Sequence, residues 1–369
     1  MKVRSLLWSA LCMLALSVTF SSCSDDDDDP WDDNGSTVEL PQRRAFILNE
    51  GMSKANNAGI AFYAPNKDAK DSQNNFISNI YLKQNNKNLG DTGQDIIEHE
   101  DKIYVILSGS KVLLRLNAAG VEEARLSFTE EDGDPRYMEA EDNKIYVTLY
   151  SGKVARIDAN TLKIEAYVTV GKNPEQIVEE NGKLYVANSG WGEGTTVSVI
   201  DIATFTKDKE IEVALNPNLL LEANDEVYLI SWGISWTTPA VPYAFQRIKS
   251  DGTVENISVA THFAEHDDII YLANSTVTDW ETYAGTNSFF SYNTKTHALN
   301  NATFMKDMPQ ELGTTAIRGI SIDDKTGDIY IYTYGTGVTN GDVYRFKNNG
   351  TFIEKFDCGG IFPSKIVFL

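Results

Sequence analysis

Short apolar segments alternate with polar turns along most of the chain, and one kind of segment recurs with an aromatic residue near its centre. The copies occupy residues 44–49, 101–107, 143–149, 182–188, 225–229, 268–274 and 327–332. Their aromatic residues are Phe46, Tyr104, Tyr146, Tyr185, Tyr228, Tyr271 and Tyr330, spaced 39 to 59 positions apart. Seven copies at such intervals indicate a repeat architecture.

Each repeat has the pattern of four short strands. An apolar strand precedes the aromatic strand, and an alternating strand such as residues 197–200 and a last strand such as residues 210–213 follow it. Alternation of period two with Gly, Asn and Asp at the turns is typical of strands, and no helical period is sustained. About forty residues is the length of a four-stranded propeller blade. We therefore predict an all-β fold, a single seven-bladed β-propeller over residues 43–369.

The two ends of this region are complementary. Residues 362–369 match the inner strand of a blade, but no aromatic strand follows them. The first copy at residues 44–48 is an aromatic strand without an inner strand before it. Pairing of the two segments would close the ring and remove free sheet edges. We therefore expect the C-terminal strand to complete the N-terminal blade.

The N-terminal residues have the features of an export signal. Lys2 and Arg4 precede an apolar run that is too short to remain as a membrane span, so residues 1–22 are expected to be a signal peptide. Two serines then precede Cys23, which resembles a bacterial lipoprotein box and implies acylation of Cys23. The alternative is ordinary secretion with a free thiol. Residues 23–42 are expected to form an acidic flexible tether. The acidic run also resembles a signal for the outer face of the outer membrane, so the expected location is lipid-anchored there and facing outward.

Composition narrows the class of protein. The chain has 369 residues, 42% hydrophobic residues and a net charge of -21. Its apolar content is too high for a disordered chain, and its acidity argues against nucleic-acid partners. Three cysteines do not make a disulfide scaffold, and Cys358 has no partner once Cys12 and Cys23 are accounted for. We expect Cys358 to be a small buried hydrophobe.

Aromatic residues gather in loops that are expected to share one face. In four-stranded blades, the loops into the inner strand and those between the second and third strands emerge on the same side. These loops contain Trp191, Trp232, Trp236, Tyr243, Trp280, Tyr283 and Tyr334. Because the loops are long and polar, we predict an aromatic rim for ligand recognition. The alternative is that the rings pack only between blades.

The mouth of the central channel is expected to be polar and chemically varied. Equivalent positions at the start of each inner strand, with three of their neighbours, give Asp95, Arg136, Tyr137, Glu175, Gln176, Asn218, Leu219, His262, Arg318 and Lys365. Such variety at repeated positions suits a ligand with several different polar groups. The alternative is a channel that holds only water.

Signals for catalysis are weak. His262 is the one histidine near the mouth, no His, Cys and carboxylate residues have metal-ligand spacing, and no Gly-x-Ser-x-Gly motif is present. We therefore expect neither a metal nor another cofactor, and no catalytic residues. A propeller lyase or hydrolase would have only His262, Glu175, Asp95 and Arg318 for acid and base chemistry.

The aromatic strands that end in Ala-Asn, the Asn-Pro pairs at residues 173–174 and 216–217, and Val-Ile-Asp at residues 199–201 resemble the YncE-like seven-bladed propeller family. Residues 46–51 and 56–59 look like the start of a group of surface lipoproteins within it. That group includes cobalamin-capturing propellers that cap a TonB-dependent outer-membrane transporter. The resemblance implies a non-enzymatic protein that captures a corrinoid for such a transporter.

Three other functions remain open at this stage. Aromatic platforms also stack on sugar rings, so glycan binding is the second hypothesis. A lyase or hydrolase is the third, and docking of another protein is the fourth. The membrane is expected to be contacted only through the lipid anchor.

Overall fold

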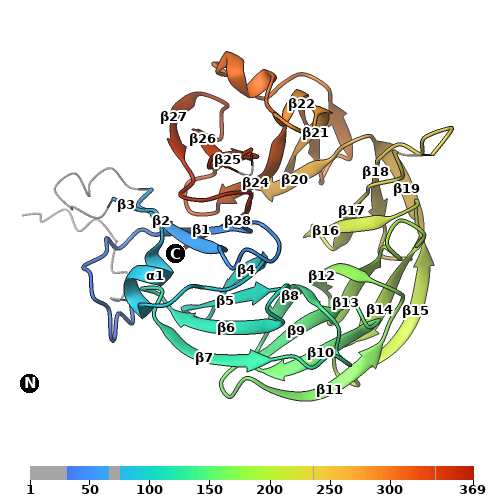
Figure 1. Ribbon diagram of the computed structural model, residues 1–369. Coiled ribbons are helices and arrows are strands. Elements are labelled where there is room, and N and C mark those ends of the chain that lie inside the picture. The colour runs from blue at the N-terminus through green and yellow to red at the C-terminus, as the bar shows by residue number, and fades with distance from the viewer. Residues whose placement is uncertain (1–30, 66–74, 236, 337) are drawn as a thin grey trace, which may run out of the picture. The chain divides into compact units, whose positions relative to one another are not determined.

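Seven four-stranded antiparallel sheets stand around a central axis in the computed structural model (Figure 1). The structure describes residues 31–65, 75–235, 237–336 and 338–369, which belong to one unit, Trp31–Leu369. Within these residues the predicted all-β, seven-bladed propeller is confirmed. None of the helices in this part of the chain is long and apolar enough to cross a membrane.

The blades are numbered from the N-terminus, and each begins with its inner strand. Blade 1 contains β28 (Pro363–Phe368), β1 (Ala45–Asn49), β2 (Gly59–Tyr63) and β3 (Phe76–Ile77). Blade 2 contains β4 (Gly93–His99), β5 (Lys102–Leu107), β6 (Val112–Asn117) and β7 (Glu122–Ser127). Blade 3 contains β8 (Pro135–Glu141), β9 (Lys144–Leu149), β10 (Lys153–Asp158) and β11 (Lys163–Thr169). Blade 4 contains β12 (Pro174–Glu180), β13 (Lys183–Asn188), β14 (Thr196–Asp201) and β15 (Thr206–Glu212).

The remaining three blades follow in chain order. Blade 5 contains β16 (Pro217–Ala223), β17 (Glu226–Ser231), β18 (Ala244–Ile248) and β19 (Val254–Ser258). Blade 6 contains β20 (His262–His266), β21 (Ile269–Asp279), β22 (Ala284–Asn293) and β23 (Ala298–Asn300). Blade 7 contains β24 (Ile317–Asp323), β25 (Asp328–Thr333), β26 (Asp342–Phe346) and β27 (Phe352–Asp357).

Two insertions account for the longest repeats. A short helix, α1 (Ile80–Asn85), lies between β3 and β4, and the side chain of Asn79 caps it by accepting a hydrogen bond from the backbone N–H of Leu82. The long hairpin of β21 and β22, with the 3-10 helix η2 (Gln310–Gly313) after β23, lengthens the sixth repeat. Both insertions leave the four-stranded blade intact.

The ring closes as the sequence predicts. β28 pairs antiparallel with β1, with Ala45 opposite Phe368 and Ile47 opposite Ile366. β1 also pairs with β2, so it is an interior strand of blade 1. The free edges that a linear array of blades would leave are thereby paired.

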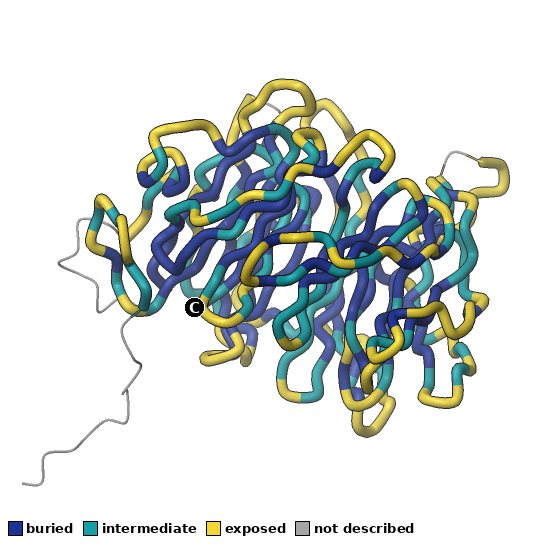
Figure 2. Tube along the Cα trace, turned by 90° about the horizontal axis from the view of Figure 1, so that it is seen from below, coloured by how far each residue is buried: buried dark blue, intermediate teal, exposed yellow. Residues whose placement is uncertain are grey.

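The second strands are almost continuously apolar because neighbouring blades cover both of their faces. In β5 every residue after Lys102 is buried, including Tyr104. Tyr104 and Ile106 of blade 2 pack in one cluster with Met138 and Ile145 of blade 3. The core therefore lies between successive blades, while the connecting loops are exposed (Figure 2).

Residues 31–42 of the expected tether pack against the propeller. Arg44, only 2% exposed, makes a paired contact with Asp33 at 2.6 and 2.8 Å and donates a hydrogen bond to the carbonyl of Ala118. Lys102 forms an ion pair with Asp32. Residues 31–42 therefore belong to the same compact unit as the propeller, whose first strand begins at Ala45. The signal peptide and Cys23 lie outside the described residues.

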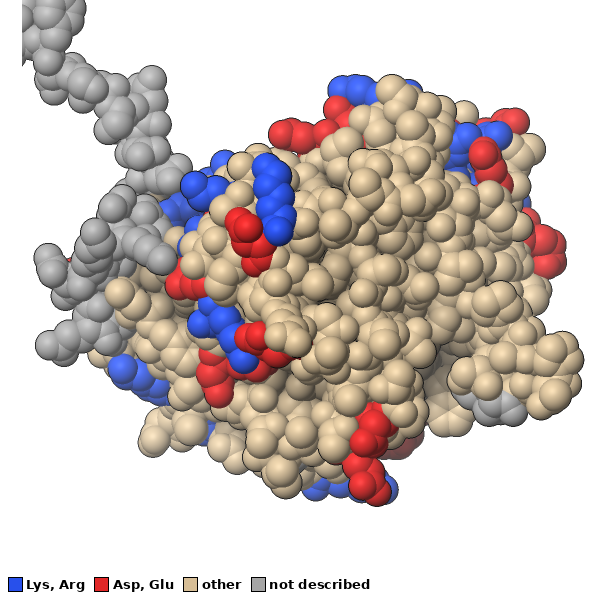
Figure 3. Space-filling model, turned by 90° about the horizontal axis from the view of Figure 1, so that it is seen from above, with Lys and Arg blue, Asp and Glu red and all other residues tan. Residues whose placement is uncertain are grey.

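Charge is unevenly distributed on the surface. On the side that Figure 3 shows, acidic and basic side chains lie mainly toward the margins and surround a broad area without them. The net charge of -21 is therefore not spread as a uniform acidic coat.

Candidate functional site

A pocket with a cavity volume of about 510 Å³ lies where the loops of blades 3, 4 and 5 meet. Six of the predicted residues line it, namely Arg136, Glu175, Trp191, Asn218, Trp232 and Tyr243. Tyr150, Ser189, Gly192, Asn216, Gly233 and Ser235 complete the lining. We call this the tryptophan pocket. The fold thus brings together residues that are more than a hundred positions apart in the chain.

The two tryptophans are held by tight glycine-containing loops. Trp191 has a left-handed backbone (φ 57°) between Gly190 and Gly192, and its side chain is 76% exposed. A Cβ on Gly194 would lie 1.9 Å from the carbonyl oxygen of Asn188, so no larger residue fits this turn. The backbone N–H of Trp232 donates to the carbonyl of Asn216 at 2.8 Å, which fixes the second indole beside the inner strand β16.

A charged network forms the polar wall of the tryptophan pocket. Arg136 Nε donates to Glu175 Oε2 at 3.0 Å, and the hydroxyl of Tyr150 donates to Glu175 Oε1. The Arg136 guanidinium lies over the Tyr150 ring, 4.7 Å from its centroid. Burial raises the pKa of Glu175, and the Arg136 charge opposes that shift. The pair supplies hydrogen-bonding atoms without a net charge.

Asn218 presents an unused hydrogen-bond acceptor. Its side chain is buried, with 4% exposure, yet its Oδ1 accepts no hydrogen bond from any described residue. Buried polar atoms are nearly always paired, because leaving one unpaired costs about 1–3 kcal/mol. Asn218 therefore contributes an unpaired buried oxygen to the inner wall of the pocket.

A second aromatic group, which we call the tyrosine cluster, comprises Trp280, Tyr283, Tyr334 and Phe362. Tyr283 and Tyr334 are stacked with ring centroids 4.7 Å apart, and Phe362 meets both rings edge-on. The rings of Trp280 and Tyr283 meet edge-on with centroids 6.2 Å apart, and Trp280 is 69% exposed. In this cluster the tyrosines pack against their neighbours, while Trp280 retains a free surface.

Arg318 adds a cation to the tyrosine cluster. Its guanidinium lies 5.3 Å from the centroid of the Tyr334 ring and forms an ion pair with Glu50. Its Nε is buried without a hydrogen-bond partner among the described residues. The guanidinium is thus held mainly by Glu50 and the Tyr334 ring.

The two aromatic groups are linked across the mouth by electrostatics. Burial raises the pKa of Tyr243 in the tryptophan pocket, and the phenol of Tyr334 adds to this shift. Burial likewise raises the pKa of Tyr137, which senses the charges of Arg136 and Arg318. The Arg136 guanidinium lies 5.8 Å from the centroid of the Tyr137 ring.

Other predicted mouth residues connect neighbouring blades. Asp95 forms an ion pair with Lys365 at 3.0 Å and accepts a hydrogen bond from the backbone N–H of Met138. Gln176 Oε1 accepts from the backbone N–H of Leu220 at 3.1 Å. The Leu219 side chain packs against the apolar cluster shared by blades 5 and 6. These residues have structural partners in addition to their place along the channel.

His262 is poorly placed for proton transfer. Its Nδ1 lies 2.8 Å from the hydroxyl of Thr261, and burial together with the Arg318 charge lowers its pKa to about 3. The imidazole is therefore neutral at physiological pH. Within the described ranges, no three His, Cys, Asp or Glu residues are grouped to hold a metal ion.

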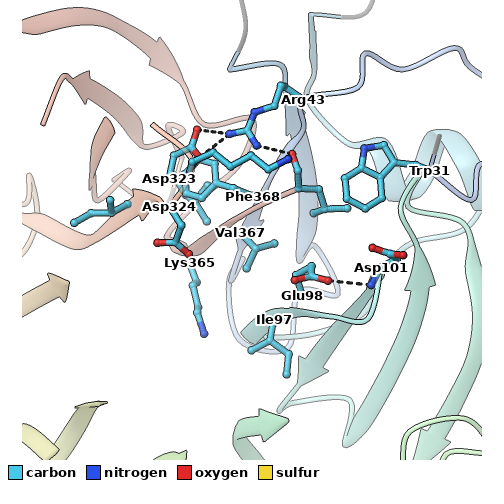
Figure 4. A pocket seen from close by; sticks show the side chains of 14 residues that line it. Trp31, Arg43, Ile97, Glu98, Asp101, Asp323, Asp324, Lys365, Val367 and Phe368 are labelled. Carbon is cyan, nitrogen blue, oxygen red and sulfur yellow. Dashed lines mark hydrogen bonds and ion pairs between the residues drawn. The ribbon is translucent and has the colours of Figure 1, made fainter. Parts of the chain in front are cut away.

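A second pocket of about 490 Å³ lies at the other end of the channel, beside the first turns of blades 2 and 7 and the closing strand β28 (Figure 4). Arg43 binds Asp323 through two contacts of 2.6 Å, and Glu98 accepts from the backbone N–H of Asp101. Lys365 is engaged with Asp95. The tryptophan pocket is the better candidate site, because it gathers two indoles and two phenols beside Arg136, Glu175 and Asn218.

Two aromatic residues of these groups escaped the sequence analysis. Tyr150 directly follows the aromatic strand of blade 3, in the same kind of loop as Trp191, so the loop rule would have found it. Phe362 precedes the closing strand and shows its role only through contact with Tyr283 and Tyr334. Trp236 lies outside the described residues.

Comparisons with solved structures agree with the fold. A quinonprotein alcohol dehydrogenase-like protein from Bacteroides thetaiotaomicron has a TM-score of 0.61 and 15% identity, covering 88% of this chain and 78% of that one. Apo AztD from Citrobacter koseri has a TM-score of 0.53 and 10% identity, covering 89% of this chain and 98% of that one. Streptogramin B lyase has a TM-score of 0.53 and 12% identity, covering 72% of this chain and 82% of that one. At such low identities the likeness shows the propeller alone.

No curated protein matches the sequence. A family model described as Domain of unknown function (DUF5074) matches residues 44–369, which is the whole propeller from its first strand to the last residue. The chain therefore belongs to the DUF5074 family, with the architecture of a seven-bladed β-propeller.

Proposed function

We propose that this protein is a non-enzymatic surface lipoprotein that captures a large nutrient ligand, with a corrinoid as first candidate, for a TonB-dependent outer-membrane transporter. The observation that carries the proposal is the placement of two aromatic groups around one channel mouth, with polar residues between them. Ligand sites commonly combine aromatic surface with a few converging polar groups.

The geometry suits a broad and flat ligand. The tryptophan pocket is one part of the mouth, and Arg318 and Trp280 belong to the other side. A ligand that contacts both must extend across the channel. A corrinoid is broad and rimmed with carboxamides, so its edge would enter the pocket while its face covers Tyr137.

The remaining parts of the proposal come from the N-terminal sequence. Acylation of Cys23 would tether the propeller to the outer membrane, and the acidic residues behind it favour the outer face. Residues 31–44 then join the tether firmly to the propeller through Asp33 and Arg44. A transporter in the same membrane would receive the ligand.

Titration calorimetry tests this function. We expect the chain from Ser24 onward, without its acyl group, to bind cyanocobalamin with micromolar or tighter affinity and to release it chemically unchanged. Trp191→Ala and Trp232→Ala should each weaken binding by roughly tenfold or more, since buried aromatic anchors dominate interface energies. Trp31→Ala is the matched control, because that indole lines the pocket at the other end of the channel. Absence of heat at millimolar ligand would contradict the corrinoid proposal.

Glycan capture is the second candidate. The tryptophan pocket combines the exposed indole of Trp191 with a neutralised Arg136 and Glu175 pair, and aromatic faces stack on sugar rings. If this candidate is correct, a glycan array should show sugar binding that Trp191→Ala abolishes. Calorimetry with cyanocobalamin should then show no binding.

A further inference from the structure

We propose that Arg136 and Arg318 are the donors by which the mouth selects its ligand, each binding an amide carbonyl through the guanidinium nitrogen that the protein leaves unpaired. This inference rests on the proposed capture function and names the ligand chemistry that the mouth selects. Such a carbonyl would come from the carboxamide rim of a corrinoid or from the N-acetyl groups of an amino-sugar glycan.

The first argument concerns how the backbone places the two arginines. In blades 2, 3, 4, 5 and 7, the pairing register between the inner strand and the second strand shifts at the mouth end. Irregularities of this kind re-aim side chains and are common beside functional sites. The residues inside these shifts include Gln94, Arg136, Glu175, Asn218 and Arg318. The two arginines therefore have equivalent positions on β8 and β24, which lie on opposite sides of the channel (Figure 1).

The second argument is that each guanidinium keeps one nitrogen both unpaired and accessible. Arg136 donates from Nε to Glu175 and from Nη1 to Gln94, while its Nη2 makes no hydrogen bond with any described residue. The Arg136 side chain is 20% exposed, and Nη2 retains accessible surface. In Arg318, Nη2 donates to Glu50 and Nε is buried, so Nη1 is the accessible unpaired nitrogen of a side chain that is 28% exposed.

The third argument is that both guanidiniums are held in place before a ligand arrives. Arg136 lies over the Tyr150 ring at 4.7 Å, and Arg318 lies over the Tyr334 ring at 5.3 Å. Other hydrogen-bonding groups of the pocket, such as the Tyr243 hydroxyl, are neutral. Hydrogen bonds from a charged donor are about twice as strong as those between neutral groups. Fixed and charged donors also lose little conformational freedom on binding, so they dominate recognition at the mouth.

The fourth argument concerns the charge of the ligand group. Each arginine already has a carboxylate neighbour, Glu175 for Arg136 and Glu50 for Arg318. A ligand carboxylate at the open nitrogen would face that glutamate across the guanidinium. Burial already disfavours the charge of Glu175, since it raises the pKa of that carboxyl, and a second anion nearby would add repulsion. An amide carbonyl accepts the same hydrogen bond without this cost.

Calorimetry with cyanocobalamin, which carries carboxamides, and chitotriose, which carries N-acetyl groups, tests the donor role. Arg136→Met and Arg318→Met should each weaken binding of the ligand that the parent binds by about tenfold or more, because a charge-assisted hydrogen bond is lost. Arg156→Met on β10 of blade 3 is the matched control. Arg156 pairs through Nε with Glu165 at 3.1 Å and lies over the Phe205 ring at 4.8 Å, but does not line the pocket, so its loss should leave binding unchanged.

A double variant guards against an indirect effect of the lost ion pair. Arg136→Met leaves Glu175 without its counter-charge, so Arg136→Met/Glu175→Met, which removes both charges, is measured beside it. Thermal unfolding identifies the variants that fold like the parent. Binding within about threefold of the parent in a folded variant of either kind would overturn the proposal.

Glu175→Gln gives a reading that a merely structural arginine would not change. Glutamine still accepts from Arg136 Nε, but the opposing negative charge is gone. In protein labelled with 5-fluorotryptophan, high millimolar propionamide should shift the fluorine resonances of Trp191 and Trp232, and propionate should shift them less. In Glu175→Gln this order should reverse. Arg136→Met should abolish both responses, and Arg156→Met should keep the response to propionamide. A parent protein that responds to neither probe, or more strongly to propionate, would overturn the proposal.

These experiments also separate the inference from the proposed function. Propionamide shifts that require Arg136, in a protein that does not bind cyanocobalamin, would remove the corrinoid function and keep the role of the arginine. Binding of chitotriose alone would then identify an N-acetylated glycan as the source of the carbonyl. Cyanocobalamin binding that is unchanged in Arg136→Met and in Arg318→Met would keep the corrinoid function and overturn the arginine proposal.

Discussion

Individual carboxylates along the inner strands experience environments that differ sharply from water. Glu139 lines the channel on β8, where burial raises its pKa to about 7, with Asp95 and Glu179 adding to the shift and Lys365 opposing it. Its ordinary value is 4.5, so the folded protein holds this proton more tightly than the unfolded chain does. Such a group links folding stability to pH.

At the scale of this residue, the sign of the pH effect follows directly. The stabilisation from the protonated Glu139 is fully present below about pH 4.5 and is lost as the pH rises through about 7. Glu139→Gln should therefore be more stable than the parent at pH 8, by about 1–2 kcal/mol, and show little advantage at pH 4.5. Urea unfolding at both pH values measures this. If the two proteins differed in free energy of unfolding by the same amount at pH 4.5 and pH 8, the raised pKa of Glu139 would be contradicted.

At the scale of elements, the turn between the first and second strands of several blades has the same side-chain device. Glu98, Glu179 and Glu265 each accept a hydrogen bond from the backbone N–H three residues later, at 3.0, 2.6 and 2.9 Å. The glutamate thus satisfies a backbone donor in the turn that the sheet cannot pair. The same hydrogen bond occurs at the equivalent turn of blades 2, 4 and 6, so it belongs to the structure of this hairpin.

The hairpin device can be tested in blade 4. Glu179→Ala should lower the free energy of unfolding by about 1 kcal/mol, because the turn N–H of Gly182 loses its acceptor, whereas Glu179→Gln should retain most of it. Glu222 has the equivalent position in blade 5 but accepts no such bond among the described residues, so Glu222→Ala is the matched control. Equal losses at the two positions would show that the hydrogen bond is not the cause.

At the scale of the whole molecule, stability depends on a strand from the end of the chain joining the blade at its beginning. β28 buries Ile366 against Ala45, Ile47 and Tyr330, which come from blades 1 and 7. Without it, β1 would become an exposed edge, and blade 1 would lack its inner strand. Exposed apolar edges invite association between molecules.

A chain that ends at Gly360 should therefore lose its cooperative thermal transition and aggregate in size-exclusion chromatography. A peptide of residues 361–369 added in trans should restore the transition, because it supplies the missing inner strand. A peptide of the same composition in scrambled order is the control. A truncated chain with an unchanged melting temperature would contradict the importance of closure.

Much of the architecture was predictable, because its signals are local and repeated. The alternation in each strand and the recurrence of an aromatic strand led to seven blades, and the unpaired segments at residues 44–48 and 362–369 led to ring closure. The common face of the loops followed from antiparallel connectivity. The docking of residues 31–42 was not predictable, since their acidic composition is typical of a tether, and the contacts of Asp33 with Arg44 are long-range.

The sequence alone determined the blade count, the order of strands and the face on which the aromatic loops emerge, because each of these depends on short-range periodicity. Only the tertiary structure decided that Trp191 and Trp232 share a pocket with Arg136, Glu175 and Asn218, while Tyr283 and Tyr334 stack on each other. It also decided that Asp95 and Gln176 bind the next blade. The physical reason is that such contacts depend on how neighbouring blades pack and on left-handed turns such as that at Trp191, which no local pattern encodes.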